Sequence, residues 1–189
     1  MSVQRQVNFG TVAALAKGVM LFKPRSTSVG RLIRVKGKLH LRNKGSLVVG
    51  RNVSFRTLHT PSSIDVGRHA ELTIGDNCFF NYGLDIGCVK SITIGSNTII
   101  GPMVNIMDSN WHPVDMDSGN DSKAVVIEEN VWIGRGAVVL PGVRIGRNSV
   151  IAAGSIVNKD IPDNVLAAGV PARIIRQLRI EDTWIRRDH

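Results

Sequence analysis

The chain has 189 residues and 43% of them are apolar, enough to bury the core of one ordinary domain, which excludes wholesale disorder. Two cysteines exclude a disulfide framework and are typical of a reduced compartment. The formal net charge is +9, and no run of residues approaches the ~20 apolar residues of a membrane span.

The positive charge lies at the start of the chain. Residues 1–64 carry twelve Lys and Arg and no Asp or Glu, whereas residues 65–189 carry twelve basic and fifteen acidic residues. Such a segment attracts an anionic partner, which leaves nucleic acid, an anionic lipid surface and a phosphate-bearing substrate as candidates. Aromatic residues are scarce there and no nucleic-acid motif is visible, so the sequence predicts no nucleic-acid partner.

Residues 1–30 are predicted to form an N-terminal segment that is partly helical. The apolar stretch 12–22, interrupted by Lys17, favours a short amphipathic helix that packs on the domain. Its alternative interpretation is an anchor on a membrane surface. No small-residue cleavage site follows this stretch, as a secretory signal peptide would require.

A strand with a basic face follows. Apolar and basic residues alternate with a period of two, which places the apolar residues on one side and the cations on the other. The cations are Arg34, Lys36, Lys38, His40 and Arg42. They indicate either a solvated edge or, through the basic residues 31–56, contact with an anionic substrate or the periphery of a membrane.

A six-residue repeat organises the rest of the chain. Aliphatic residues recur without a break at Ile127, Ile133, Val139, Ile145, Ile151 and Val157, and the pattern appears upstream from Ile74 to Ile106. Six residues fit a short strand and a tight turn, with the aliphatic residue inward, and stacked units of this kind bury a continuous column. The period therefore predicts a parallel β-helix.

The repeat breaks once, between Ile106 and Ile127. These 21 positions are not a multiple of six, and they are rich in Asp, Asn, Gly and Pro. We expect an extended loop over residues 107–125, and a loop that leaves a rigid scaffold is a favoured place for functional residues.

These residues resemble the hexapeptide acyltransferase family. The likeness is closest to its sugar O-acetyltransferases, such as the galactoside and maltose acetyltransferases, and to acetyltransferases of polysaccharide biosynthesis. It covers about residues 64–178, and its most specific stretches are Val131–Ala137, Leu140–Val143, Ala153–Ser155, Lys159–Pro162 and Ala167–Arg173. The resemblance implies an all-β fold, a left-handed parallel β-helix over residues 31–171, and a homotrimer that binds acyl-CoA between neighbouring chains.

The resemblance places the catalytic histidine at His112, in Asn110-Trp111-His112-Pro113. A histidine suits proton removal from a sugar hydroxyl because its usual pKa of about 6.5 lies near working pH. The hypothesis is direct transfer, with His112 as general base. Zinc chemistry needs a convergent set of histidines, which His112 lacks nearby, so no metal is predicted.

The acceptor site is predicted at Asn81, Asp85 and Trp111. Asn81 matches a family asparagine that contacts the sugar. The family often has a second asparagine and an aspartate shortly after, where this chain has Gly83 and Cys88, and Asp85 is the candidate replacement. Trp111 offers a flat face to a sugar ring or anchors the loop.

The resemblance also implies the site for acetyl-CoA, the expected cosubstrate. Its arm is expected to run along Trp132, Gly136, Ala153 and Gly154, with Asn158, Lys159 and Arg173 near the phosphate end, where cations are apt. A C-terminal helix over residues 172–189 is predicted to cover the end of the column.

The sequence thus predicts an acetyl-CoA-dependent carbohydrate O-acetyltransferase in the cytoplasm, with the inner face of the membrane as an alternative location. The basic first third favours an acceptor that is larger or more anionic than a free sugar. Two alternatives remain: an N-acetyltransferase on an amino sugar, which is sometimes linked to a nucleotide, and a non-catalytic scaffold that binds anionic surfaces.

Overall fold

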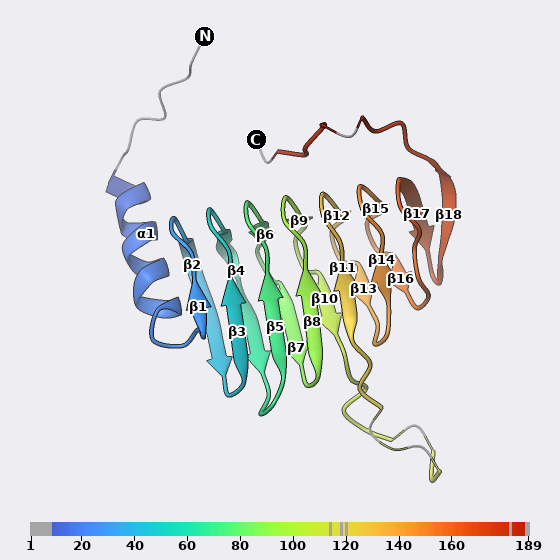
Figure 1. Ribbon diagram of the computed structural model, residues 1–189, viewed down its shortest axis with the longest axis horizontal. Helices are drawn as coiled ribbons and strands as arrows, with labels where there is room; N and C mark the ends of the chain where they lie inside the picture. Colours follow the sequence, from blue (N-terminus) through green and yellow to red (C-terminus); the bar gives the residue numbers. More distant parts are fainter. Residues whose placement is uncertain (1–8, 114, 118, 120, 182, 188–189) are drawn as a thin grey trace.

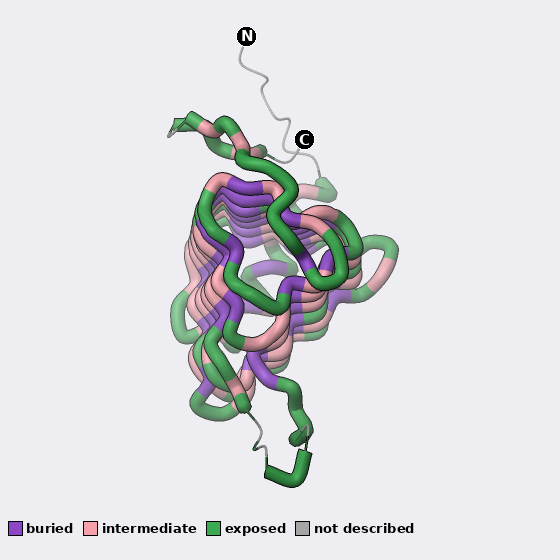
Figure 2. Tube along the Cα trace, turned by 90° about the vertical axis from the view of Figure 1, so that its right-hand side faces the viewer, coloured by how far each residue is buried: buried purple, intermediate pink, exposed green. Residues whose placement is uncertain are grey.

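The computed structural model describes residues 9–113, 115–117, 119, 121–181 and 183–187. It begins with one helix, α1 (Phe9–Phe22), which is the predicted helix of the N-terminal segment. Strands follow and coil into a solenoid of triangular cross-section, with buried residues lining the inside (Figures 1 and 2). The predicted left-handed parallel β-helix is confirmed.

The solenoid has three faces built of parallel strands stacked coil on coil. The first face is a six-stranded sheet of β1 (Ser28–Val29), β3 (Ser46–Val49), β5 (Glu71–Ile74), β8 (Ser91–Ile94), β11 (Val125–Ile127) and β14 (Arg144–Ile145). The other two faces share one larger sheet, because the long strand β4 (Ser54–Val66) bends from one to the other. Its first residues pair with the second face and its last residues with the third.

The second face consists of β6 (Phe79–Asn81), β9 (Ile99–Ile100), β12 (Trp132–Ile133), β15 (Val150–Ile151), β17 (Val165–Gly169) and β18 (Ala172–Gln177). The third face consists of β7 (Asp85–Cys88), β10 (Asn105–Met107), β13 (Val138–Val139) and β16 (Ile156–Val157). The predicted basic strand is β2 (Arg34–Asn43), which pairs with β4. Its apolar side is largely buried and four of its five cations are exposed.

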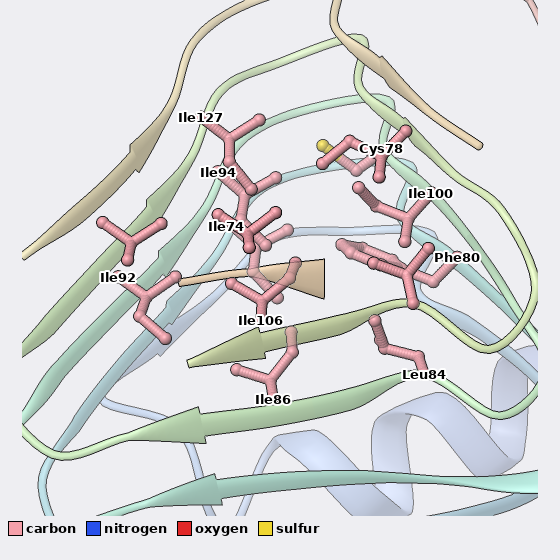
Figure 3. Close-up of a cluster of buried hydrophobic side chains, with 14 of the residues drawn as sticks. Ile74, Cys78, Phe80, Leu84, Ile86, Ile92, Ile94, Ile100, Ile106 and Ile127 are labelled. Atoms are coloured by element: carbon pink, nitrogen blue, oxygen red, sulfur yellow. The ribbon is translucent and has the colours of Figure 1, made fainter. Parts of the chain in front are cut away.

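The six-residue repeat forms the core. All six aliphatic residues from Ile127 to Val157 are fully buried. Ile127 pairs with Ile145 one coil further on, so three repeats make one coil of 18 residues. Figure 3 shows residues of consecutive coils stacked in this way, such as Ile74, Ile94 and Ile127. At the N-terminal end the column is aromatic, since Phe22, Phe55 and Phe80 stack ring on ring.

The corner between the first and second faces is built of asparagines with positive φ, and we call it the asparagine corner. Its members are Asn52, Asn77, Asn97, Asn130, Asn148 and Asn164. Asparagine tolerates this left-handed conformation better than other side chains. The amide of Asn130 donates to Asn148 at 2.7 Å, and that of Asn148 to Asn164 at 2.8 Å. The corner therefore joins successive coils.

The predicted C-terminal helix over residues 172–189 is wrong. Residues 172–177 form β18, which returns antiparallel to β17, and no helix is found in the described residues after it. A final strand leaves unpaired backbone N–H and C=O groups at its edge, and β18 satisfies them. The β-branched Ile174 and Ile175 suit a strand. Residues 182, 188 and 189 of the predicted helix lie outside the described residues.

Candidate functional site

The predicted loop leaves the solenoid after β10 and returns at β11, and its base is held by Asp108. The Asp108 carboxylate is fully buried. It accepts the backbone N–H groups of Val89, Lys90 and Ser91, in the turn of the preceding coil, at 2.7, 2.8 and 2.7 Å. Three donors to one carboxylate make a strong anchor, because hydrogen bonds to a charged acceptor are stronger than neutral ones.

Backbone contacts complete this base. Ser109 and Ser122 form an antiparallel bridge, and the N–H of Lys123 donates to the carbonyl of Asp108 at 2.8 Å. Beyond the base the loop projects from the solenoid (Figures 1 and 2). His112 lies just beyond the base and is exposed. The predicted base is therefore open to a substrate but attached to a fixed root.

Trp111 folds back from the loop onto the third face. A Cβ atom built on Gly87 of β7 would lie 2.9 Å from Cζ2 of Trp111, so the missing side chain makes room for the indole ring. Asp85 projects from the same side of β7, two residues earlier. Its carboxylate accepts the amide of Asn105, on β10, at 3.1 Å. Trp111 and Asp85 therefore belong to one face, from which the loop carrying His112 departs.

A cleft of about 570 Å³ lies on the second face. Its lining includes three of the predicted site residues, Asn81, Trp132 and Ala153. The rest of the lining is mostly aliphatic or aromatic, with Arg135 at the edge. An apolar trough with a few polar groups suits a long and partly apolar ligand.

The predicted residues Gly136 and Gly154 lie at the corner between the second and third faces. Both have positive φ, and a Cβ atom on either would meet nothing within 4 Å. The backbone conformation, not crowding, therefore explains these glycines, and the corner is open along consecutive coils. The N–H of Gly154 donates to the carbonyl of Arg135 at 2.8 Å, in the turn of the previous coil.

The three residues predicted near the phosphate end are exposed. Asn158 and Lys159 lie in the turn after β16, and Arg173 lies on β18. One chain thus holds the predicted residues in two groups. Asn81, Trp132 and the glycine corner border the second face, whereas Asp85, Trp111 and the His112 loop belong to the third face and its far edge. Asn81 precedes β7, and the loop follows the parallel strand β10, so the strand length separates them.

Residues 183–187 form a C-terminal tail that the sequence analysis missed. The tail returns over the coils and lines a second hollow of about 860 Å³. This hollow shares Phe79, Asn81, Ile99 and Trp132 with the first cleft, and it adds Arg56, Thr183, Trp184, Ile185, Arg186 and Arg187. The tail therefore forms a wall of the predicted acetyl-CoA region.

The tail is attached at the asparagine corner. Arg186 donates to the carbonyls of Asn130 and Asn148 at 3.1 and 2.8 Å, and its guanidinium lies 4.8 Å from the ring centre of Trp184. Burial lowers the pKa of Arg186. No local pattern signals these contacts, because they join residues more than 35 positions apart.

Both cysteines are buried as free thiols. Burial raises the pKa of Cys78 to about 12. Burial and the nearby carboxylate of Asp108 raise that of Cys88 to about 12. Such thiols are poor nucleophiles at neutral pH. Among the described residues, no group of three or more His, Cys, Asp and Glu side chains is placed to hold a metal ion.

Comparison with known proteins places the chain in a family. Residues 124–159 match the bacterial transferase hexapeptide (six repeats) family. Over 154 residues the chain is 36% identical to the putative lipopolysaccharide biosynthesis O-acetyl transferase WbbJ of Escherichia coli K12, which covers 75% of this chain and 77% of that protein. The chain belongs to the hexapeptide-repeat transferase family.

Two further members of the family are similar. The galactoside O-acetyltransferase of Lactococcus lactis subsp. lactis IL1403 is 46% identical over 112 residues, which are 57% of this chain and 54% of that protein. This chain thus spans about half the length of that relative. The solved structure of the hexapeptide-repeat acetyltransferase VCA0836 from Vibrio cholerae, complexed with acetyl coenzyme A, is 28% identical with a TM-score of 0.65 and covers 87% of this chain and 78% of that one.

Proposed function

We propose that the chain is an acetyl-CoA-dependent O-acetyltransferase that acts on a hydroxyl of a sugar or polysaccharide precursor. The observation that carries this proposal is the likeness to WbbJ across three quarters of both chains, combined with a loop that presents His112 to solvent at the expected place. The likeness to a galactoside O-acetyltransferase supports a carbohydrate hydroxyl as the acceptor.

In the proposed reaction His112 is the general base. It removes the hydroxyl proton of the acceptor while the oxygen attacks the carbonyl carbon of the thioester. A C–O bond forms, the C–S bond breaks, and the thiolate of CoA leaves and takes up the proton. The buried cysteines make no covalent intermediate in this scheme, because thiols with raised pKa values are weak nucleophiles.

The residues present fit the donor. The open corner at Gly136 and Gly154 leaves room for a narrow chain to lie against the backbone, and Trp132 and Ala153 line the adjoining cleft. The exposed cations Lys159 and Arg173 suit the phosphates of CoA. Asn81, Asp85 and Trp111 remain the proposed acceptor residues.

We also propose a homotrimer. The predicted residues lie on two faces of one chain, so a neighbouring copy is needed to bring a second-face group against the His112 loop. Light scattering on the purified chain measures the number of copies directly. A monomer with full activity would contradict this part of the proposal.

The test of the reaction is release of the CoA thiol, measured with purified chain, acetyl-CoA and a panel of acceptors that carry hydroxyl or amino groups. The protein's own thiols are buried, so they add little background. We expect His112→Ala to lower kcat by about 10²- to 10⁴-fold. The matched control is His40→Ala, another exposed histidine, which should leave kcat unchanged.

The other outcomes of this assay select among the alternatives. Transfer to amino sugars alone would replace the proposal with an N-acetyltransferase. Normal turnover in His112→Ala would remove the general base. A folded protein that neither binds acetyl-CoA nor releases CoA would favour the non-catalytic scaffold.

Calorimetry tests the donor site without an acceptor. Acetyl-CoA and its dephospho analogue are titrated into wild type, Lys159→Ala and Arg173→Ala. We expect the preference for the phosphorylated ligand to shrink by about tenfold in a variant that has lost a phosphate contact. Arg68→Ala, which removes an exposed cation from a turn on the same solenoid, is the control. Equal loss for both ligands would contradict a phosphate contact.

A further inference from the structure

Helix α1 closes the N-terminal end of the column with one of its faces. Ala14, Gly18 and Phe22 are buried on that face, and the ring of Phe22 stacks on Phe55 with centroids 5.3 Å apart. A Cβ atom on Gly18 would lie 2.1 Å from the carbonyl oxygen of Ile33, so the helix lies directly on the first coil. The helix is therefore the cap of the solenoid.

The opposite face of this cap is apolar too. Phe9, Val12, Val19 and Met20 are 89, 53, 55 and 75% exposed, and the exposed residues among them on that face are the alanines 13 and 16. A cap that ends a solenoid normally presents a polar outer face, and a helix that is apolar all round is normally covered on all sides. Among the described residues nothing covers this outer face.

Positive charge surrounds the cap. Lys23 follows the helix, and Lys36 and Lys38 lie on β2, against which the helix packs. All three are exposed, and none has an acidic partner within the described part of the chain. The ammonium group of Lys17 donates to the carbonyl of Gly37, which fixes the helix to this strand. The first 64 residues contain no acidic residue.

We propose that the outer face of α1 binds the interface of an anionic lipid bilayer. In this arrangement Phe9, Val12, Val19 and Met20 enter the boundary of the acyl chains, and Lys23, Lys36 and Lys38 contact lipid phosphates. An apolar helical face with cations beside it is the pattern of interfacial helices, and basic residues add attraction to anionic headgroups. A second copy of the chain is a poorer occupant, because two surfaces without acidic residues would repel each other.

The binding has a geometric consequence. Helix α1 runs across the end of the solenoid and not along it (Figure 1). A helix lying flat on the bilayer would therefore make the solenoid stand upright, with the His112 loop and the cleft on its sides. Substrates attached to the membrane would then meet the site from the side of the solenoid.

Vesicle sedimentation of the full chain tests the proposal without any substrate. We expect binding to phosphatidylcholine vesicles that contain about one third phosphatidylglycerol, weak binding to phosphatidylcholine alone, and loss of binding as salt rises. The double variant Val12→Gln/Met20→Gln should reduce binding by about tenfold or more. Its matched control is Leu58→Gln/Ile175→Gln, which changes two equally exposed apolar residues on the solenoid wall.

A charge variant separates the two contributions. Lys36→Gln/Lys38→Gln should lower binding to anionic vesicles several-fold and leave the weak binding to neutral vesicles unchanged. Arg68→Gln/Lys90→Gln removes two exposed cations from turns of the solenoid and should have little effect. Circular dichroism and thermal unfolding of each variant verify that the chain is folded.

Three results would overturn the proposal. Wild type that ignores both vesicle types would exclude a lipid surface. Equal binding by wild type and Val12→Gln/Met20→Gln would exclude the outer face of α1. If those substitutions instead change the mass of the protein in solution, the outer face is a contact between copies of the chain.

Discussion

The coils of the column and the loop that leaves them after β10 are held in different ways. Each coil is fixed along its length, because its inward residues stack on those of the next coil, as Ile127 does on Ile145. The loop is fixed at its base, where Asp108 and the Ser109–Ser122 bridge bind it, while His112 beyond the base is exposed. The difference shows how a rigid scaffold presents a reactive side chain on a segment that contributes little to the core.

The largest effect is expected in the column. Phe22→Ala removes the first ring of the aromatic stack and leaves a cavity beside Phe55, and we expect a loss of about 3–5 kcal/mol in the free energy of unfolding. Denaturant unfolding measures it. Phe9→Ala, on the exposed side of the same helix, should change stability by less than about 0.5 kcal/mol. Similar losses in both variants would show that the two faces of α1 are equally covered.

The base of the loop comes next. Asp108→Asn replaces a charged acceptor of three backbone N–H groups with an amide that has one acceptor oxygen, and we expect a loss of about 2 kcal/mol. It should also lower kcat, because His112 loses its fixed root. Asp115→Asn, further along the loop and exposed, is the control and should preserve both quantities. A stable Asp108→Asn protein with normal kcat would contradict the anchor.

The tail is a second segment outside the column, and its attachment is weaker. Arg186→Ala removes hydrogen bonds to the carbonyls of Asn130 and Asn148, with an expected cost of about 1 kcal/mol. Limited trypsin digestion should then cut faster at Arg179. The exposed neighbour provides the comparison, since Arg187→Ala should leave the cleavage rate unchanged. Equal rates in wild type and Arg186→Ala would show that the tail is held by other contacts.

A smaller effect on stability, and a specific effect on the acceptor, is expected where the loop touches the column. Gly87→Ala places a methyl group 2.9 Å from Cζ2 of Trp111 and should displace the ring. We expect KM for the acceptor to rise several-fold while affinity for acetyl-CoA stays the same. Gly119→Ala has open space around it and serves as the control. A rise in donor Kd instead would move Trp111 to the donor site.

At neutral pH the buried thiols have the smallest effect, and it grows with alkali. The folded chain keeps the protons of Cys78 and Cys88 up to a pKa of about 12, whereas the unfolded chain loses them near pH 9. Stability is therefore full below about pH 9 and falls as pH rises toward 12. Denaturant unfolding at pH 7 and pH 10 measures the fall, which Cys78→Ala should reduce. An unchanged fall would assign it to other groups.

The column was predictable because its physics is periodic. One aliphatic residue every six positions identifies the inward side at Ile127 and Val157 alike, and the break after Ile106 locates the loop. The site residues were suggested by family resemblance, and their placement on two faces became visible only in three dimensions. The strand at Ile174 and Ile175 was mistaken for a helix because its pairing with β17 depends on a distant edge. The contacts of Trp184 and Arg186 have no local signal for the same reason.

The register of the coils has a consequence for how this chain can change over evolutionary time. Residues stack on partners 18 positions later in the regular coils, as Ile133 does on Ile151, whereas Ile94 stacks on Ile127, 33 positions later. The surplus is therefore expelled as the loop while the stacking continues on both sides. Duplication or deletion of 18 residues would lengthen or shorten the scaffold without changing its cross-section. An insertion of any other length would emerge as a new loop, so the same scaffold offers many places where a new reactive side chain can arise.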